Sequence, residues 1–371
     1  MKQTPLSTTH ARLGAVFAEF SGWEIPRHYG DPAKEHGAVR GGVGLCDRSF
    51  LGKIQVGGKD RQEFLHSLVS NNVKSLRASE GTYATLLTPK GKMLGDLWIY
   101  VCEEDCLILT EACAAQTIAQ TLEKYILMSD VSLENQTESH GVLSIFGPHS
   151  AHLVRTLLGE LPAGAKKWKH VSRIFHGSPI LIARNEYTGE EGFDLLAARD
   201  VLGNLWSTLR QEVSGMSALP IGWDTLEILR VEAGIPRFGQ DMDKETIPLE
   251  AGIEASAIDF HKGCYIGQEI ISRAAHRGHV NRKLIGLKLS PGCLPATGDT
   301  ILREGTRAGE ITTAVSSPRF GPIALGYIHR DLAATGENFL VGGLSAQTVD
   351  LPFYSRMAES PTSPRNAEPA P

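Results

Sequence analysis

The chain has 371 residues, of which 42% are hydrophobic and 21% are charged, which is ordinary usage for a soluble globular protein. Its formal net charge of −5 gives no bulk electrostatic reason for nucleic acid or an anionic membrane to bind. No apolar run approaches the roughly 20 residues of a membrane span, and the first residues lack the apolar core of a signal peptide, so we expect a cytoplasmic protein without a disulfide framework.

Residues 50–137 have the pattern of a compact α+β unit. Short apolar runs predict strands, at 51–56, 83–87, 93–101, 107–109 and 131–133. Apolar residues at helical spacing predict one helix from Asp60 to Val69 and a second that contains Ile118 and Leu122. The order β-α-β-β-(β)-α-β is typical of a ferredoxin-like lobe.

Residues 142–234 repeat a similar rhythm of strands and helices, and from about residue 283 the pattern changes to short strands separated by Gly, Pro and Ser. The alternation of Ile285, Leu287 and Leu289, followed by further apolar runs up to 349–351, predicts a small β-barrel or sandwich. We therefore divide the chain into a region at 1–275, a β domain at 276–352 and a tail at 353–371. We expect the tail to be disordered because it cannot bury a core.

The segment Lys262-Gly263-Cys264-Tyr265-Ile266-Gly267-Gln268-Glu269 (KGCYIGQE) concentrates more chemistry than any other stretch. Its glycines permit sharp turns and close backbone approach. Lys262 would favour the thiolate of Cys264, which could ligate iron transiently, react with a sulfur species or form a mixed disulfide. A stable iron–sulfur cluster normally needs four ligands and no CxxC companion is present, so we predict no stable metal. The alternative is a buried structural cysteine.

Several segments, in unchanged order, resemble the T-protein (aminomethyltransferase) of the glycine cleavage system. They are FSGWEIP at 20–26, YTGEEGFD at 187–194, LRVEAG at 229–234 and PLEAG at 248–252, and the likeness spans nearly all of residues 4–352. The KGCYIGQE segment instead resembles the signature of YgfZ-type folate-binding proteins, which act in maturation or repair of iron–sulfur enzymes. The resemblance implies an α+β fold, a three-lobed ring around a central folate channel with a C-terminal antiparallel β-barrel.

The resemblance also implies site residues. Tyr83, Tyr187, Asp194 and Arg230 would form a cradle for tetrahydrofolate, and Asp96 would face its reactive nitrogens. T-proteins usually carry Glu in place of Asp194, so the pterin would have to sit deeper here or bind through water. From the residues alone other interpretations stay open: a solvated turn aspartate at 96, a core tyrosine at 83, turn or capping positions at 187 and 194, and at 230 a helix-surface arginine paired with a nearby glutamate.

Three functions follow as hypotheses. The leading one is a tetrahydrofolate-binding protein that supports assembly or repair of iron–sulfur proteins, which would be its partners. Its catalytic residues would be Asp96, Cys264 and Lys262. The second is a tetrahydrofolate-dependent aminomethyl or related one-carbon transferase, favoured by Asp96. The third is a non-catalytic folate-sensing scaffold with a structural Cys264. Under each hypothesis we expect a monomer that binds tetrahydrofolate or a one-carbon derivative. Whether the protein is an enzyme depends on which of the three hypotheses holds.

Overall fold

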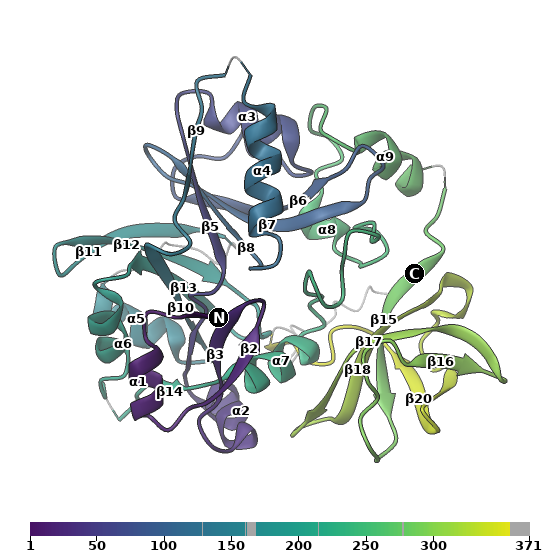
Figure 1. The fold of residues 1–371 in the computed structure, drawn as a ribbon. Helices are drawn as coiled ribbons and strands as arrows, with labels where there is room; N and C mark the ends of the chain where they lie inside the picture. Colours follow the sequence, from purple (N-terminus) through teal and green to yellow (C-terminus); the bar gives the residue numbers. More distant parts are fainter. Residues whose placement is uncertain (128, 160, 162–167, 214, 277, 357–371) are drawn as a thin grey trace, which may run out of the picture.

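The computed structural model describes residues 1–127, 129–159, 161, 168–213, 215–276 and 278–356. They form three lobes around a common centre, a five-stranded lobe, a six-stranded lobe that carries the N-terminus, and a C-terminal barrel (Figure 1). The predicted α+β class and the antiparallel C-terminal barrel are confirmed. Among the described residues no helix is long and apolar enough to cross a membrane.

The five-stranded lobe has the predicted ferredoxin-like order plus one edge strand. Its elements are β5 (Gly52–Gly57), α3 (Arg61–Leu68), β6 (Glu80–Leu87), β7 (Met93–Val101), β8 (Cys106–Thr110), α4 (Ala115–Tyr125) and β9 (Ser132–Asn135). The sheet order is β6-β7-β8-β5-β9 with antiparallel neighbours. Strands β5, β7, β8 and β9 form the ferredoxin-like unit together with α3 and α4, and β6 is the additional edge strand. Ile118 and Leu122 of α4 are buried in the core of this lobe, as their helical spacing predicts.

The six-stranded lobe combines segments that lie far apart in the chain. Its elements are β4 (Gly44–Asp47), β10 (His140–Phe146), α5 (Ser150–Leu158), β11 (His170–Phe175), β12 (Ser178–Asn185), β13 (Gly192–Ala198), α6 (Leu202–Leu209) and β14 (Leu219–Pro220). The strand order is β11-β12-β13-β10-β4-β14. The apolar runs at 142–146 and 180–183 predict strands and correspond to β10 and β12, but the apolar pattern does not identify β4, β11, β13 or β14.

The first 41 residues add a small sheet and two helices to this lobe. They are β1 (Lys2–Gln3), α1 (Ser7–Arg12), β2 (Val16–Phe20), β3 (Trp23–His28) and α2 (Pro32–Gly41), with sheet order β1-β3-β2. Helix α2 begins where the side chain of Asp31 accepts a hydrogen bond from the backbone N–H of Ala33, and Pro32 occupies its first turn. Both features are favourable at a helix N-terminus.

The segment between the six-stranded lobe and the barrel connects all three lobes. Helix α7 (Trp223–Glu232) packs on β3 and on barrel strands β17 and β18. The chain then returns to the five-stranded lobe, where α8 (Glu254–Ala257) packs on β6, and continues through α9 (Gln268–His276). These crossings place residues 234–256 between the lobes, close to the candidate site.

The C-terminal domain is a closed barrel of six antiparallel strands. Its elements are β15 (Arg282–Leu289), β16 (Thr300–Arg303), β17 (Thr306–Ser317), β18 (Gly321–His329), the short 3-10 helix η1 (Arg330–Leu332), β19 (Asn338–Val341) and β20 (Leu344–Val349), and the barrel order is β15-β18-β17-β16-β19-β20. The structure corrects two details, because β16 was not predicted and the apolar run at 349–351 begins only where β20 ends.

The start of the predicted disordered tail is folded. Tyr354 is buried, its backbone N–H donates to the carbonyl of Glu232 at 2.8 Å, and its hydroxyl donates to the carboxylate of Glu190. The guanidinium of Arg40 lies 3.7 Å from the centre of the Tyr354 ring. Residues 353–356 therefore belong to the folded body, while the rest of the predicted tail, 357–371, lies outside the described residues.

Candidate functional site

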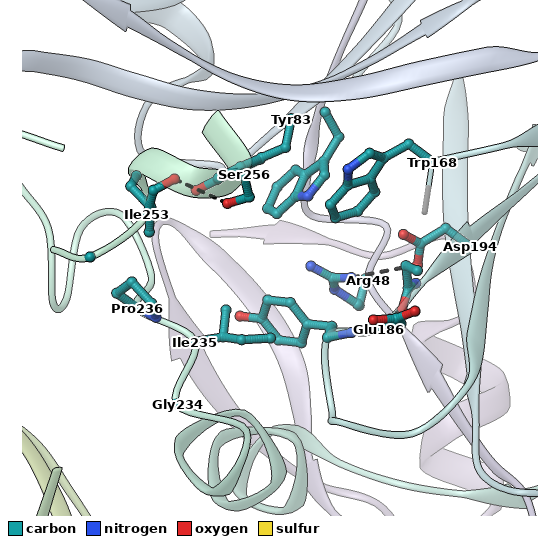
Figure 2. A pocket seen from close by; sticks show the side chains of 14 residues that line it. Arg48, Tyr83, Trp168, Glu186, Asp194, Gly234, Ile235, Pro236, Ile253 and Ser256 are labelled. Carbon is teal, nitrogen blue, oxygen red and sulfur yellow. Dashed lines mark hydrogen bonds and ion pairs between the residues drawn. The ribbon is translucent and has the colours of Figure 1, made fainter. Parts of the chain in front are cut away.

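A cavity of about 210 Å³ is lined by residues of both sheet lobes and of the segment that follows α7. Figure 2 shows Tyr83, Trp168 and Ser256 along one side of this cavity and Gly234, Ile235 and Pro236 along the other. The lining residues are Arg48, Tyr83, Trp98, Trp168, Asn185, Glu186, Tyr187, Asp194, Gly234, Ile235, Pro236, Gly252, Ile253 and Ser256.

One wall of the cavity is aromatic. Tyr83 on β6 and Trp98 on β7 are direct cross-strand partners, with ring centres 5.6 Å apart and planes 36° apart. The Trp168 ring lies 6.1 Å from that of Tyr83 at 30°. Trp168 has a φ of 66°, an uncommon backbone conformation for a bulky residue. These tilted aromatic rings offer a broad apolar surface against which a planar heterocycle or an aminobenzoyl ring could pack.

Asp96 lies behind this wall and is linked to the cavity through Tyr83. On the paired strands Asp96 is the diagonal neighbour of Tyr83, so both side chains share one face, and the Tyr83 hydroxyl donates to Oδ2 of Asp96 at 2.8 Å. Asp96 is 2% exposed, and its Oδ1 has no hydrogen-bond partner among the described residues.

The environment of Asp96 favours its protonated form. Burial raises the pKa of Asp96 to about 7, and the nearby carboxylate of Glu111 acts in the same direction, while the Tyr83 hydroxyl and Arg237 partly oppose it. A carboxyl group with a pKa near 7 can accept and return a proton at neutral pH. The alternative of a solvated turn aspartate does not fit a side chain with this burial.

An ion pair forms another part of the cavity lining. Cys46, Ser144 and Asp194 are register partners across β4, β10 and β13, so their side chains lie in a row. The Ser144 hydroxyl donates to Oδ1 of Asp194, and Nη1 of Arg48, just beyond β4, lies 3.5 Å from the same oxygen. The Arg48 guanidinium also lies 4.5 Å from the centre of the Tyr187 ring. A cation, a carboxylate and an aromatic face are thus presented together.

Charge around Arg48 keeps it protonated although it is buried. Burial by itself lowers the pKa of Arg48, but the neighbouring carboxylates, Asp194 first and then Glu111, outweigh that effect and raise it above the usual value. Burial also raises the pKa of Tyr187 well above its usual value. The cavity therefore contains a permanent cation beside a neutral phenol.

Arg230 lies outside the cavity lining. Its side chain is 0% exposed, Nη1 donates to Asp241 at 2.7 Å, and Nε and Nη2 donate to Glu227 at 3.0 and 2.9 Å. Nη2 also lies 3.4 Å from the Thr313 hydroxyl of β17. The pairing with Glu227 that the sequence suggested as an alternative is present, but it is buried between α7 and the barrel rather than on a helix surface.

Lys262 and Cys264 also lie outside the cavity lining. The Lys262 ammonium donates to the backbone carbonyls of Val69 at 2.6 Å, Asn71 at 3.0 Å and His66, so its three donors are used by the 66–71 segment. Burial lowers the pKa of Lys262 to about 8. Cys264 is exposed. In the described ranges no group of three or more His, Cys, Asp and Glu side chains could hold a metal ion.

The structure thus brings Tyr83, Tyr187 and Asp194 into one cavity with Asp96 adjoining it. Sequence reasoning did not identify Arg48, Trp98 or Trp168 as lining residues. For Trp98 a signal existed, because a residue two positions beyond Asp96 on the same strand points to the same face. We find no local signal in the sequence for Arg48 or Trp168, whose positions depend on how the lobes assemble.

Comparisons with known proteins cover almost the whole chain. Residues 6–262 match the family model of the GCVT N-terminal domain, and residues 282–355 match that of the glycine cleavage T-protein C-terminal barrel domain. An aminomethyltransferase from Streptomyces coelicolor is 30% identical over 96% of this chain and 98% of its own length. One from Halothermothrix orenii is 30% identical over 95% of this chain and 100% of its own length.

A solved structure shares the fold. The glycine cleavage system aminomethyltransferase T from Bartonella henselae superposes with a TM-score of 0.87 at 25% identity, covering 96% of this chain and 98% of that one. All three lobes are therefore common to both proteins.

Proposed function

Since the chain belongs to the glycine cleavage T-protein family, we propose that it is a tetrahydrofolate-dependent aminomethyltransferase or a closely related one-carbon transferase. The observation that carries this proposal is Asp96, a buried carboxyl group with a pKa of about 7 that is hydrogen-bonded to the cavity-lining Tyr83. The aminomethyltransferase names of full-length relatives favour transfer chemistry over the leading iron–sulfur hypothesis.

The residues of the cavity fit a folate. The rings of Tyr83, Trp98 and Trp168 offer flat apolar contact, and the Arg48–Asp194 pair offers polar groups that can read the edge of a heterocycle. When bound, tetrahydrofolate supplies the nitrogens that accept the one-carbon unit. The aromatic wall would exclude water from those nitrogens, and Asp194 and Arg48 would orient the ring.

Asp96 would serve as the proton acceptor through Tyr83. The Tyr83 oxygen would receive the proton that a folate nitrogen releases when that nitrogen displaces a leaving group, ammonia or the carrier's sulfur, from the transferred carbon. The phenolic proton would pass at the same time to Oδ2 of Asp96. The 2.8 Å hydrogen bond supplies the path, and the pKa of about 7 allows the carboxylate to be regenerated at neutral pH. General base catalysis of this kind contributes about 10²- to 10⁴-fold.

The test is a glycine cleavage reconstitution in which this chain is the aminomethyltransferase component and ammonia release is measured with and without tetrahydrofolate. We expect folate-dependent release with the wild type and a loss of about 10²-fold or more with Asp96→Asn. Folate binding by the variant, measured separately, should persist. Absence of folate-dependent turnover by a folded wild-type protein would sink the proposal.

A second candidate role, support of iron–sulfur proteins, rests on Cys264, which is exposed on the KGCYIGQE segment and is therefore accessible to a client protein. Complementation of a gene deletion separates the roles. Loss of iron–sulfur enzyme activity with Cys264→Ala, but not with Asp96→Asn, would favour this candidate. Loss of glycine cleavage with Asp96→Asn alone favours the transferase, and full function of both variants favours a non-catalytic folate-sensing scaffold.

A further inference from the structure

Glu111 is a second buried carboxylate on the sheet face that carries Asp96. Trp98 on β7 pairs with Leu109 on β8, and each step back along β7 matches one step forward along β8 (Figure 1). Continued by two steps, this register places Glu111 opposite Asp96, on the same face of the sheet as Trp98 of the cavity lining. The Thr110 hydroxyl donates to the backbone oxygen of Asp96 at 2.8 Å, which keeps the two segments together beyond the last ladder pair.

Both carboxyl groups are buried, and each has an oxygen without a donor. Asp96 is 2% exposed and Glu111 is 1% exposed. Oδ1 of Asp96 and Oε2 of Glu111 have no hydrogen-bond partner among the described residues. The buried Glu227, by contrast, accepts from Arg230 and Arg237 at 2.9–3.2 Å. Burial by itself raises the pKa of Glu227, but these two arginines outweigh that effect and lower the pKa to about 2. Glu111 lacks the donors that such a structural carboxylate has.

The charges around Glu111 leave it acting on Asp96. The titratable and charged groups that face it are Arg48, Cys113, Glu227, Arg230 and Arg237. Burial raises the pKa of Glu111, and the three arginines only partly oppose this. Arg237 opposes it most, yet its Nη2 donates to Glu227 at 3.2 Å. After burial, the charge of Glu111 is the largest cause of the raised pKa of Asp96, against which the Tyr83 hydroxyl and Arg237 act.

We propose that Glu111 is a positioning residue of the transfer site, whose negative charge beside Asp96 makes the two carboxylates take up one proton as a unit. This inference rests on the proposed transferase function and adds to it a residue that controls the proton acceptor. Tyr83 reaches Asp96 from the β6 side of β7, and Glu111 lies on the β8 side. Like charges directly opposite each other on neighbouring strands repel, and uptake of one proton relieves that repulsion.

The role of Glu111 is to adjust the base to neutral pH without reaching the folate. When the Tyr83 hydroxyl delivers its proton, one O–H bond forms at Asp96 and the pair passes from two negative charges to one. Without the neighbouring charge, Asp96 would ionise at lower pH and would bind this proton less strongly. Because a general base works best when its pKa lies near the working pH, loss of the Glu111 charge should change the pH range of transfer.

The test is the pH–rate profile of folate-dependent transfer for the wild type, Glu111→Gln and Glu111→Asp. Glutamine keeps the size of the side chain and removes its charge, whereas aspartate keeps the charge. The matched control is Glu103→Gln, at the exposed far end of the same β7–β8 hairpin. A second readout needs no turnover: urea unfolding between pH 4.5 and 8.5 for Asp96→Asn, made with and without Glu111→Gln and compared each time with its parent.

We expect Glu111→Gln to move the rising limb of the profile about one pH unit or more toward acid. From a wild-type value near 7, a shift of about one pH unit raises the ratio of the rate at pH 6 to the rate at pH 8 about fivefold. Glu111→Asp and the control should keep the wild-type limb. In unfolding, the stability advantage of Asp96→Asn over its parent should be smaller when Glu111→Gln is present, and it should reach its plateau about one pH unit lower.

A Glu111→Gln limb at the wild-type position, or an equal loss of rate at every pH, would overturn the inference while the proposed function stands. A Glu111→Gln protein that fails to fold would do the same, because it would show that this carboxylate makes a structural contact. A wild type without folate-dependent turnover would overturn the proposed function. The unfolding series then decides on the pair by itself, and an identical advantage of Asp96→Asn in both backgrounds would refute the coupling of the two carboxylates.

Discussion

Replacing Asp96 by asparagine should stabilise the protein above neutral pH while it removes the proposed proton acceptor. Burial raises the pKa of Asp96 from 3.8 to about 7 in the folded state. As pH rises from about 4 to about 7, the unfolded chain therefore loses this proton while the native protein retains it, and stability falls over that interval. Above pH 7 both states are ionised and the full penalty is present.

The size of the effect follows from the two pKa values. The rise from 3.8 to about 7, at about 1.4 kcal/mol per unit, corresponds to an ionisation penalty of about 4 kcal/mol. Asparagine has nearly the same volume, retains an oxygen for the Tyr83 hydroxyl and carries no charge. The amide of asparagine would be imperfectly hydrogen-bonded, which offsets part of this gain. We therefore expect the free energy of unfolding of Asp96→Asn to exceed that of the wild type by about 2–4 kcal/mol at pH 8, and most of this difference to disappear toward pH 4.

The assay is urea unfolding followed by tryptophan fluorescence at several pH values between 4.5 and 8.5. Asp331→Asn, which alters an aspartate whose side chain is 66% exposed, is the matched control and should change unfolding little at any pH. The reasoning is refuted if Asp96→Asn is less stable than the wild type at pH 8. It is also refuted if the difference between the two proteins is the same at pH 5 and pH 8.

Three further outcomes can be measured on the same protein. The Tyr83 hydroxyl lowers the pKa of Asp96, so Tyr83→Phe should shift the rising limb of the pH–rate profile above pH 7 and slow transfer about tenfold or more. An unchanged pH–rate profile would show that Tyr83 is not on the proton path. Arg230→Met breaks buried ion pairs with Glu227 and Asp241 and should lower the free energy of unfolding, measured with heat or urea, by about 3–5 kcal/mol. Unchanged unfolding together with a loss of folate affinity would instead place Arg230 in the ligand cradle. Cys264→Ala should leave stability and transfer unchanged because the thiol is exposed and outside the cavity lining, and a loss of transfer would contradict this placement.

Local patterns in the sequence were sufficient for much of the architecture. Apolar periodicity predicted the elements of the five-stranded lobe, where Met93–Val101 was identified with the bounds that β7 has. It also predicted the class of the C-terminal domain, because buried faces of helices and strands repeat at short, fixed spacings. The order of motifs predicted the T-protein superfamily. The resemblance pointed separately to Tyr83, as part of the folate cradle, and to Asp96, as the carboxylate that faces the reactive nitrogens.

The chemistry of the site depended on tertiary structure. Arg48 meets Asp194 across 146 positions of sequence because β4, β10 and β13 are neighbours in one sheet, a pairing that no local pattern encodes. Burial likewise decides the pKa of Asp96 and the pairing of Arg230, since desolvation depends on the packing of separate lobes. The sequence by itself determined the T-protein superfamily and the class of fold, and it predicted Asp96 as the principal carboxylate. Only the assembled lobes decided which charges face the cavity, because those contacts join residues far apart in the chain.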